Sequence, residues 1–129
     1  MSERTSTQKM SAVKVLRESH GKRRQIVGDY VKIEDDKIVG YCALGALACE
    51  AGGVELTKGG ASNDGITSYS TLKILSSLKA YDLPFRNTRC PICGTSRGST
   101  LDLITHLNDI ELLSFFDIAI VLELWEGLE

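Results

Sequence analysis

The residues best suited to chemistry in this chain form the turn Cys90-Pro91-Ile92-Cys93-Gly94. Two cysteines separated by two residues can both reach one ion, because a tetrahedral zinc site needs thiolates about 2.3 Å from the metal. Gly94 allows the chain to curl behind the second cysteine, so that backbone N–H groups can point at the sulfur atoms. The turn therefore predicts half of a structural zinc site, with Zn²⁺ as the cofactor.

The third ligand is predicted from spacing. Twelve residues separate Cys93 from His106, which is the spacing of the first three ligands in a C2H2 zinc finger. The fourth ligand of such a finger is missing at its usual place, because the segment 108–114 contains neither His nor Cys. The other half of the site must therefore be completed from elsewhere.

Four candidates remain for the fourth position: Cys42, Cys49, Glu111 and water. Cys42 and Cys49 lie seven residues apart, about two helical turns or ~10 Å, so one ion can take only one of them. We favour Cys42, since the start of a helix is easier for a metal to reach than its buried middle. The expected site is thus made of Cys42, Cys90, Cys93 and His106.

Other roles for the cysteines are also considered. Cys42 and Cys49 could be small apolar residues in a buried helix, because free cysteine is among the most buried residue types. The Cys-Pro-x-Cys sequence also occurs in thioredoxin-like oxidoreductases, where the first cysteine begins a helix. Here Gly94, Gly98 and Ser99 oppose a helix at the turn, and the remaining chain reads as two helices without further strands. Redox catalysis is therefore the distant alternative.

Length and charge limit the class of protein. The chain has 129 residues, which fits one domain spanning 1–129. A net charge of −2 argues against a general nucleic-acid coat, which would be basic. Basic residues nevertheless gather in the first part of the chain and around the cysteine turn. Weak nucleic-acid binding through the zinc turn is therefore an alternative, with the candidate residues Lys22, Arg23, Arg24, Arg86, Arg89 and Arg97.

The sequence favours a cytoplasmic location. Residues 1–8 are polar, where a signal peptide needs an apolar core. No apolar stretch reaches the ~20 residues that a membrane helix requires. In the cytoplasm thiols are reduced, so cysteine pairs favour metal binding over structural disulfides.

The periodicity predicts an α+β fold that is mostly helical, in one domain with one β-hairpin and a zinc-knuckle-like CPxCG turn. Residues 1–5 are expected to be disordered, and Ser6 or Thr7 to cap the first helix. In the helix expected over 70–80, Leu72, Leu75 and Leu78 should lie on one side. The first helix is expected to end at about residue 18, and four further helices are expected over 42–51, 70–80, 99–107 and 114–125. A hairpin is expected over 30–34 and 37–41, and a loop over 57–65.

Two local features are expected to be structural. Gly45 costs the helix about 1 kcal/mol relative to Ala, which close approach of another backbone could offset. Asn108 and Asp109 invite interpretation as a polar site, but such side chains commonly bond to nearby backbone and end helices. We therefore expect these two residues to form a helix-ending corner between the last two helices.

Three motifs in this chain resemble those of a group of small uncharacterised proteins of bacteriophages, prophages and related mobile elements. They are Gly40-Tyr41-Cys42-Ala43-Leu44-Gly45-Ala46-Leu47, then His106-Leu107-Asn108-Asp109, and then Phe116-Asp117-Ile118-Ala119 ahead of Leu122-Glu123. Some of them carry a CPxC turn ahead of HLND. The resemblance implies that the Cys42 helix and the Leu107–Asp109 corner belong to one packed unit. It implies no activity. Between Asp109 and Phe116 this chain departs from the charged or turn-forming stretch that is common in that group.

Together these features predict a non-enzymatic, zinc-stabilised interaction protein. If the resemblance holds, its unidentified protein partner would be a host factor, met in the host cytoplasm by a virus or mobile element. The zinc-dependent nucleic-acid-binding protein is the alternative, and the CxxC redox enzyme the distant one. The sequence predicts neither the oligomeric state nor the partner.

Overall fold

The computed structural model describes residues 9–58, 67–84, 86–125 and 127. Over these residues the α+β prediction is confirmed, with five α-helices and three antiparallel two-stranded sheets. The predicted disorder of residues 1–5 and the predicted caps Ser6 and Thr7 lie outside the described residues. The helices are α2 (Ala12–Ser19), α3 (Ala43–Glu50), α4 (Thr71–Ser77), α5 (Thr100–Asp109) and α6 (Phe115–Trp125).

The strands form local hairpins instead of one sheet. The predicted hairpin is confirmed as β1 (Val31–Glu34) and β2 (Lys37–Tyr41). Asp35 and Asp36 both have positive φ, 52° and 64°, which is the backbone of the tight two-residue turns that match strand twist. Two further hairpins were not predicted, because strands of two or three residues show no alternation: β3 (Leu56–Lys58) with β4 (Thr67–Tyr69), and β5 (Thr88–Arg89) with β6 (Ser96–Arg97).

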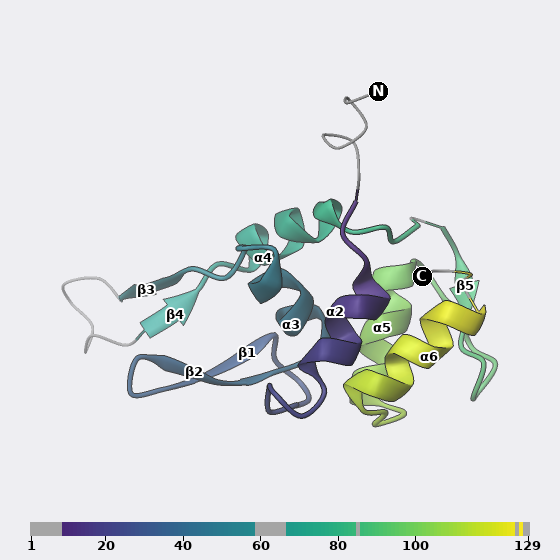
Figure 1. The fold of residues 1–129 in the computed structure, drawn as a ribbon, viewed down its shortest axis with the longest axis horizontal. Coiled ribbons are helices and arrows are strands. Elements are labelled where there is room, and N and C mark those ends of the chain that lie inside the picture. The colour runs from purple at the N-terminus through teal and green to yellow at the C-terminus, as the bar shows by residue number, and fades with distance from the viewer. Residues whose placement is uncertain (1–8, 59–66, 85, 126, 128–129) are drawn as a thin grey trace.

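One apolar core holds the helices together. Helix α2 packs against both α6 and α3, and its buried residues include Val13 and Leu16. Helix α3 is buried along most of its length. In Figure 1 the hairpins β1–β2 and β3–β4 lie at one end of the molecule, and α5, α6 and β5 lie at the other. The cysteine turn is therefore held at the helical end.

Two helices differ from prediction. Helix α2 begins only after Ser11, whose side chain accepts from Lys14 N, because the backbone of Met10 pairs instead with residues 80 and 82. In α4, Leu72 is 80% exposed, while Ile74 and Leu78 are buried. The three leucines therefore do not share one side of the helix, since Leu78 joins Ile74 in the core and Leu72 lies in solvent. The predicted loop is shorter too, because Thr57 and Lys58 belong to β3.

The close approach expected at Gly45 is confirmed. A Cβ atom on Gly45 would lie 1.8 Å from the carbonyl oxygen of Tyr30. The same carbonyl accepts from Cys42 N at 3.0 Å, so the residue before β1 is tied to the first turn of α3. The absence of a side chain at position 45 lets this hydrogen bond and the packing of α3 coexist.

Asn108 is a buried structural residue, as expected, but it lies inside the last turn of α5. Its Oδ1 accepts from Ala43 N at 3.0 Å and from Gln25 Nε2 at 2.8 Å, and its Nδ2 donates to Ile26 O at 2.8 Å. The side chain thus links α5 to α3 and to the segment before β1. The implied packing of the Cys42 helix against the Leu107–Asp109 corner is therefore present. No helix among the described residues is long and apolar enough to span a membrane.

Candidate metal centre

The cysteine turn is closed by the β5–β6 hairpin. Cys90 N donates to Thr95 O and Gly94 N donates to Cys90 O, both at 2.9 Å. Gly94 has a φ of +79°, a conformation that glycine adopts without steric cost. Ile92 N lies 3.4 Å from Cys90 Sγ as a donor. The turn therefore points a backbone N–H at a sulfur atom, as a metal-binding thiolate requires.

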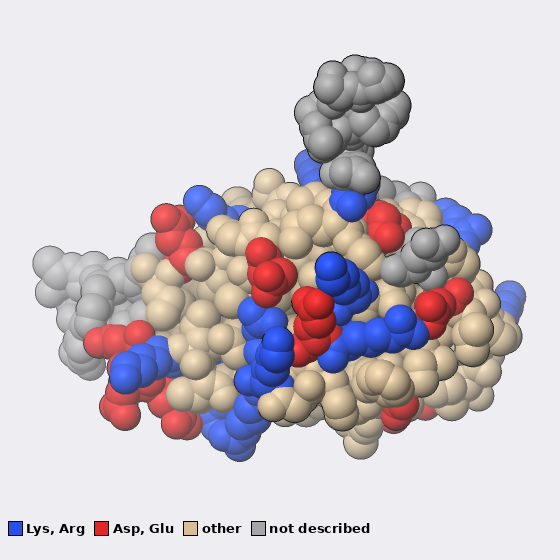
Figure 2. Space-filling view, in the orientation of Figure 1, with Lys and Arg blue, Asp and Glu red and all other residues tan. Residues whose placement is uncertain are grey.

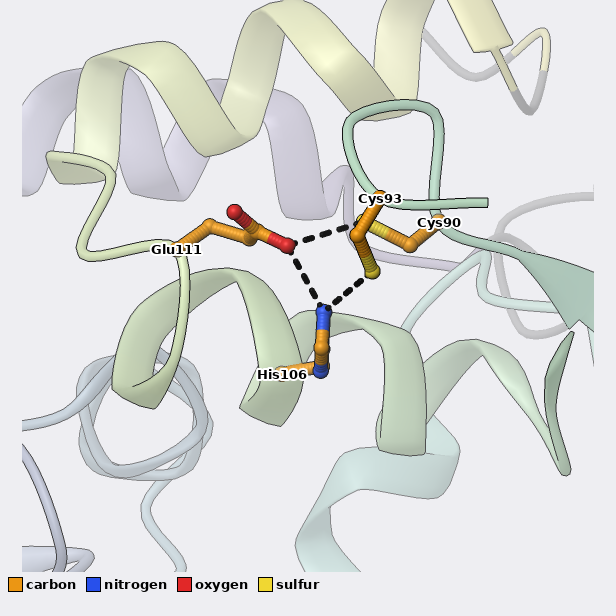
Figure 3. Close-up of side chains that lie close together, drawn as sticks. All are labelled: Cys90, Cys93, His106 and Glu111. Atoms are coloured by element: carbon orange, nitrogen blue, oxygen red, sulfur yellow. Dashed lines mark hydrogen bonds and ion pairs between the residues drawn. The ribbon is translucent and has the colours of Figure 1, made fainter. Parts of the chain in front are cut away.

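Helix α5 supplies the histidine. Ser99 caps this helix by accepting from Asp102 N at 3.1 Å, and His106 projects from its last two turns toward the cysteines (Figure 3). The imidazole Nε2 lies 3.3 Å from Cys93 Sγ. The three residues predicted from spacing, Cys90, Cys93 and His106, are thus brought together.

The end of α5 brings a fourth group to the same place. Glu111 Oε2 lies 2.9 Å from His106 Nε2 and 3.5 Å from Cys90 Sγ. The chain folds back because Ile110 N and Glu111 N both donate to His106 O, and Leu113 N donates to Leu107 O. Leu112 takes a φ of +58° to allow this, a left-handed conformation that costs a residue with a side chain about 1–2 kcal/mol. A strained corner therefore holds the carboxylate against the histidine.

The four ligand atoms have the spacing of a metal site. The sulfur, nitrogen and oxygen atoms of Cys90, Cys93, His106 and Glu111 all lie within 4.8 Å of one another. Bonds of ~2.0–2.3 Å in a tetrahedron separate ligand atoms by roughly 3.3–3.8 Å. The contacts of 2.9, 3.3 and 3.5 Å in this cluster are close to that range. The cluster could hold a metal ion with small side-chain adjustments.

The site is largely shielded from solvent. Cys90 is 1% exposed and His106 is 7% exposed, while the Glu111 side chain is 15% exposed. Cys93 is exposed and forms the open side of the cluster. An ion held here would have protein on most sides, with one accessible sulfur.

The electrostatics of the cluster are mixed. Burial raises the pKa of the Cys90 thiol, whereas the hydrogen bond to the Thr95 side chain, at 3.1 Å, lowers the pKa of Cys93. Hydrogen bonds from Cys93 and then from His106 lower the pKa of Glu111. The carboxylate of Glu111 and the thiolate of Cys93 are therefore more favoured than in the free side chains. Burial disfavours the thiolate of Cys90, and a metal ion would supply a positive charge that offsets this effect.

Arg97 lies behind the histidine. Its Nη1 is 3.2 Å from His106 Nδ1, and its Nε is 4.0 Å from Asp102 Oδ2. A guanidinium group only donates, so His106 Nδ1 accepts in this arrangement. Ligation through Nε2 of a neutral imidazole would place the proton on Nδ1, and Arg97 would then turn toward Asp102.

The choice of Cys42 as the fourth ligand is corrected by this geometry. Cys42 is the N-cap of α3, where its Sγ accepts from Gly45 N at 3.4 Å. It lies outside the group of ligand atoms, in which Glu111 takes the fourth position. Cys49 is half-buried near the end of α3 and is also outside the group. Sequence reasoning named Glu111 as the acidic candidate at suitable spacing, but preferred sulfur to oxygen.

The basic residues of the nucleic-acid alternative belong to two regions. Arg23 is held by Glu50 at 3.0 Å and lies over the Tyr41 ring. Its neighbours Lys22 and Arg24 follow α2 in the chain, whereas Arg89 and Arg97 belong to the β5–β6 hairpin and Arg86 precedes that hairpin in the chain. On the face seen in Figure 2, blue basic groups alternate with red acidic ones. This face therefore offers no uniformly basic surface for a phosphate backbone.

No protein-family model, curated protein or solved structure matches this chain. The resemblance to small phage and mobile-element proteins thus stays a prediction from sequence motifs. The structure itself supports a narrower statement, which is that Cys90, Cys93, His106 and Glu111 form a group able to hold a metal ion.

Proposed function

We propose that this chain is a zinc-stabilised interaction protein without enzymatic activity, which acts on a host factor for a virus or mobile element. The observation that carries the zinc part is the group of four converging ligand atoms. The part concerning a host factor rests on the sequence resemblance alone. The proposal gives the metal a structural role and leaves binding to the protein surface.

Zinc is the ion that suits the donor set best. Two cysteine sulfurs and an imidazole are soft or borderline ligands, which Mg²⁺ and Ca²⁺ do not favour. A carboxylate oxygen is an accepted zinc ligand at ~2.0–2.2 Å. Four protein ligands also match the closed coordination of structural zinc, since catalytic zinc usually keeps one position for water.

The position of the cluster supports a structural role. Its ligands come from the turn after β5, from α5 and from the corner before α6. The β5–β6 hairpin has only two residues in each strand, so its own ladder contributes little stability. An ion here would fasten this hairpin to the helical core.

The geometry gives less support to redox catalysis. No helix begins at the turn, because residues 90–95 are irregular and α5 starts at Thr100. The first cysteine is the buried one, and burial raises its pKa. In a thioredoxin-like site the first cysteine has a lowered pKa at a helix N-terminus.

Metal content tests the zinc part. Protein purified without chelator should contain close to one zinc per chain by elemental analysis, and a thiol reagent should modify Cys90 slowly until a chelator is added. Chelation should also lower the Tm, because metal that binds only the folded state stabilises it. Absence of zinc, together with rapid modification of both Cys90 and Cys93 in the folded protein, would overturn the proposal.

Exposed apolar side chains near the metal cluster allow a test of the proposed binding to a host protein. Ile110 and Leu112 flank Glu111 and are 66% and 68% exposed. Tagged protein should capture a host protein from an extract of the native host, and the double variant Ile110→Ser, Leu112→Ser should capture much less of it while keeping its metal. Leu72→Ser, which removes an exposed leucine on α4, is the matched control. Capture that nuclease treatment abolishes would favour the nucleic-acid alternative instead.

A further inference from the structure

A second cavity lies apart from the metal cluster and shares no residue with it. Its volume is about 220 Å³. It is formed where the segment before β1, the start of α3, strand β4 and helix α5 meet. The residues that give it its chemistry are Asp29, Tyr30, Cys42, Tyr69, Thr105 and Asp109.

The charged groups of this cavity are two carboxylates. Asp29 and Asp109 line it, and none of the other described residues that line it is Lys, Arg or His. Among the residues whose side chains the structure describes, neither carboxylate forms an ion pair. Asp109 accepts a hydrogen bond from Asn108 Nδ2 at 2.7 Å, which leaves further acceptor positions on its oxygens. The cavity therefore carries negative charge that the described groups do not neutralise.

Two tyrosine rings form an aromatic wall. The rings of Tyr30 and Tyr69 are in edge-to-face contact, with centroids 6.3 Å apart and planes at 86°. The face of an aromatic ring is electronegative and attracts cations that lie within about 6 Å of its centroid. Both tyrosines line the cavity, so a ring face turned toward it would add an attraction for cations that is independent of the two carboxylates.

The most buried of the described residues that line the cavity is Cys42. The residue is 8% exposed, and burial raises the pKa of its thiol, to which Asp109 adds. The sulfur accepts from Gly45 N, but no described residue accepts from its S–H. A neutral, polarisable thiol suits contact with an alkyl chain better than contact with a second charge.

We propose that this cavity binds an alkylammonium group, with the ammonium held between Asp29 and Asp109 and against the tyrosine rings. A volume of 220 Å³ is below the ~300–1,000 Å³ of pockets that enclose drug-sized ligands. The site therefore suits a small amine or a single lysine side chain. This inference goes beyond the proposed function and does not depend on metal binding.

The first test compares three probes of equal length that differ in charge. Full-length protein, as purified, is titrated with n-butylammonium, n-butanol and butyrate while backbone amide shifts are followed by NMR. Butylammonium should move the signals of Gly28, Thr105 and Asp109 with a Kd in the millimolar range. Butanol should bind at least tenfold more weakly, and butyrate should not bind. Equal binding of the amine and the alcohol would overturn the proposal.

Variants then test the named groups. Asp29→Asn and Asp109→Asn should each weaken butylammonium binding by about tenfold, and Tyr69→Leu by several-fold. Glu34→Gln, which removes a carboxylate from β1 outside the cavity, should leave the Kd unchanged. If Glu34→Gln weakens binding as much as Asp29→Asn does, the effect is one of net charge and the assigned site is wrong. Because Asp29 is exposed, its variant should fold normally.

A last comparison separates the two sources of the group. Free butylammonium and N-acetyl-lysine methylamide carry the same chemistry, but only the second has the backbone of a protein partner. Tighter binding of the lysine derivative supports a partner's side chain, and tighter binding of the free amine supports a small metabolite. Failure of both to bind contradicts this inference while leaving the zinc proposal untouched, because that proposal is measured by metal content.

Discussion

Cys90→Ser and Glu111→Gln should each lose stoichiometric zinc, whereas Cys42→Ser should keep it. Cys90 and Glu111 both belong to the converging group of ligand atoms, and Cys42 does not. Loss of a supporting outer hydrogen bond typically costs ~10–100-fold in metal affinity, so loss of a direct ligand should cost more. Competition with a chromophoric chelator, with zinc content per chain as readout, would measure both effects.

The effect on stability should follow the same order. Cys90 is buried, and its loss should lower the Tm most, because it removes a ligand and leaves the β5–β6 hairpin less tied to α5. Cys42→Ser should lower the Tm modestly, since serine is a better N-cap than cysteine but a poorer apolar group. If Cys42→Ser released the metal and Glu111→Gln retained it, the assignment of the fourth ligand would be wrong. Equal retention in both would point to water.

Gly45→Ala should destabilise the fold by more than the ~1–3 kcal/mol that overpacking usually costs. The new Cβ would lie 1.8 Å from Tyr30 O and 2.7 Å from Tyr30 C. These are backbone atoms, so no side-chain rotation can relieve the overlap. Either α3 or the segment before β1 must move, which would break the hydrogen bond from Cys42 N to Tyr30 O.

Urea unfolding of Gly45→Ala and Gly98→Ala would test this expectation. At Gly98 the nearest atom to an added Cβ is Asp102 Oδ2 at 3.9 Å, so the same substitution should cost little there. A stability of Gly45→Ala within about 1 kcal/mol of the parent protein would show that the first turn of α3 can shift without loss. Such a result would also weaken the placement of Cys42 at the wall of the second cavity.

The motifs on which the predicted resemblance to phage-associated proteins rests acquire separate structural roles. Tyr41, Cys42 and Gly45 surround the start of α3, and Asn108 fastens the end of α5 to that start through Ala43 N. His106 turns the other way, toward the cysteines. The segment expected to depart from that group, between Asp109 and Phe116, includes the Glu111 carboxylate and the strained Leu112.

The sequence by itself determined the features that depend on neighbouring residues. The turn at Cys90–Cys93 was predictable because a CPxCG segment closes locally. The helix starts near 70, 99 and 114 were predictable too, and in the structure Ser70, Ser99 and Ser114 each accept a hydrogen bond from the N–H three residues later. His106 was predictable as the third ligand from its spacing after Cys93. The hairpin around Asp35 and Asp36 was also local, since a two-residue turn sets its own register.

The tertiary structure decided what depends on how distant segments pack. Spacing in the sequence could not decide whether Cys42 or Glu111 is the fourth ligand. That assignment depends on where α3 lies relative to the cysteine turn and on the left-handed conformation of Leu112. The buried face of α4 was settled by its neighbours, which cover Ile74 and leave Leu72 in solvent. The second cavity joins side chains from four segments, and no periodicity in the chain marks it. These features depend on packing between residues that are distant in the sequence, so the tertiary structure was needed to identify them.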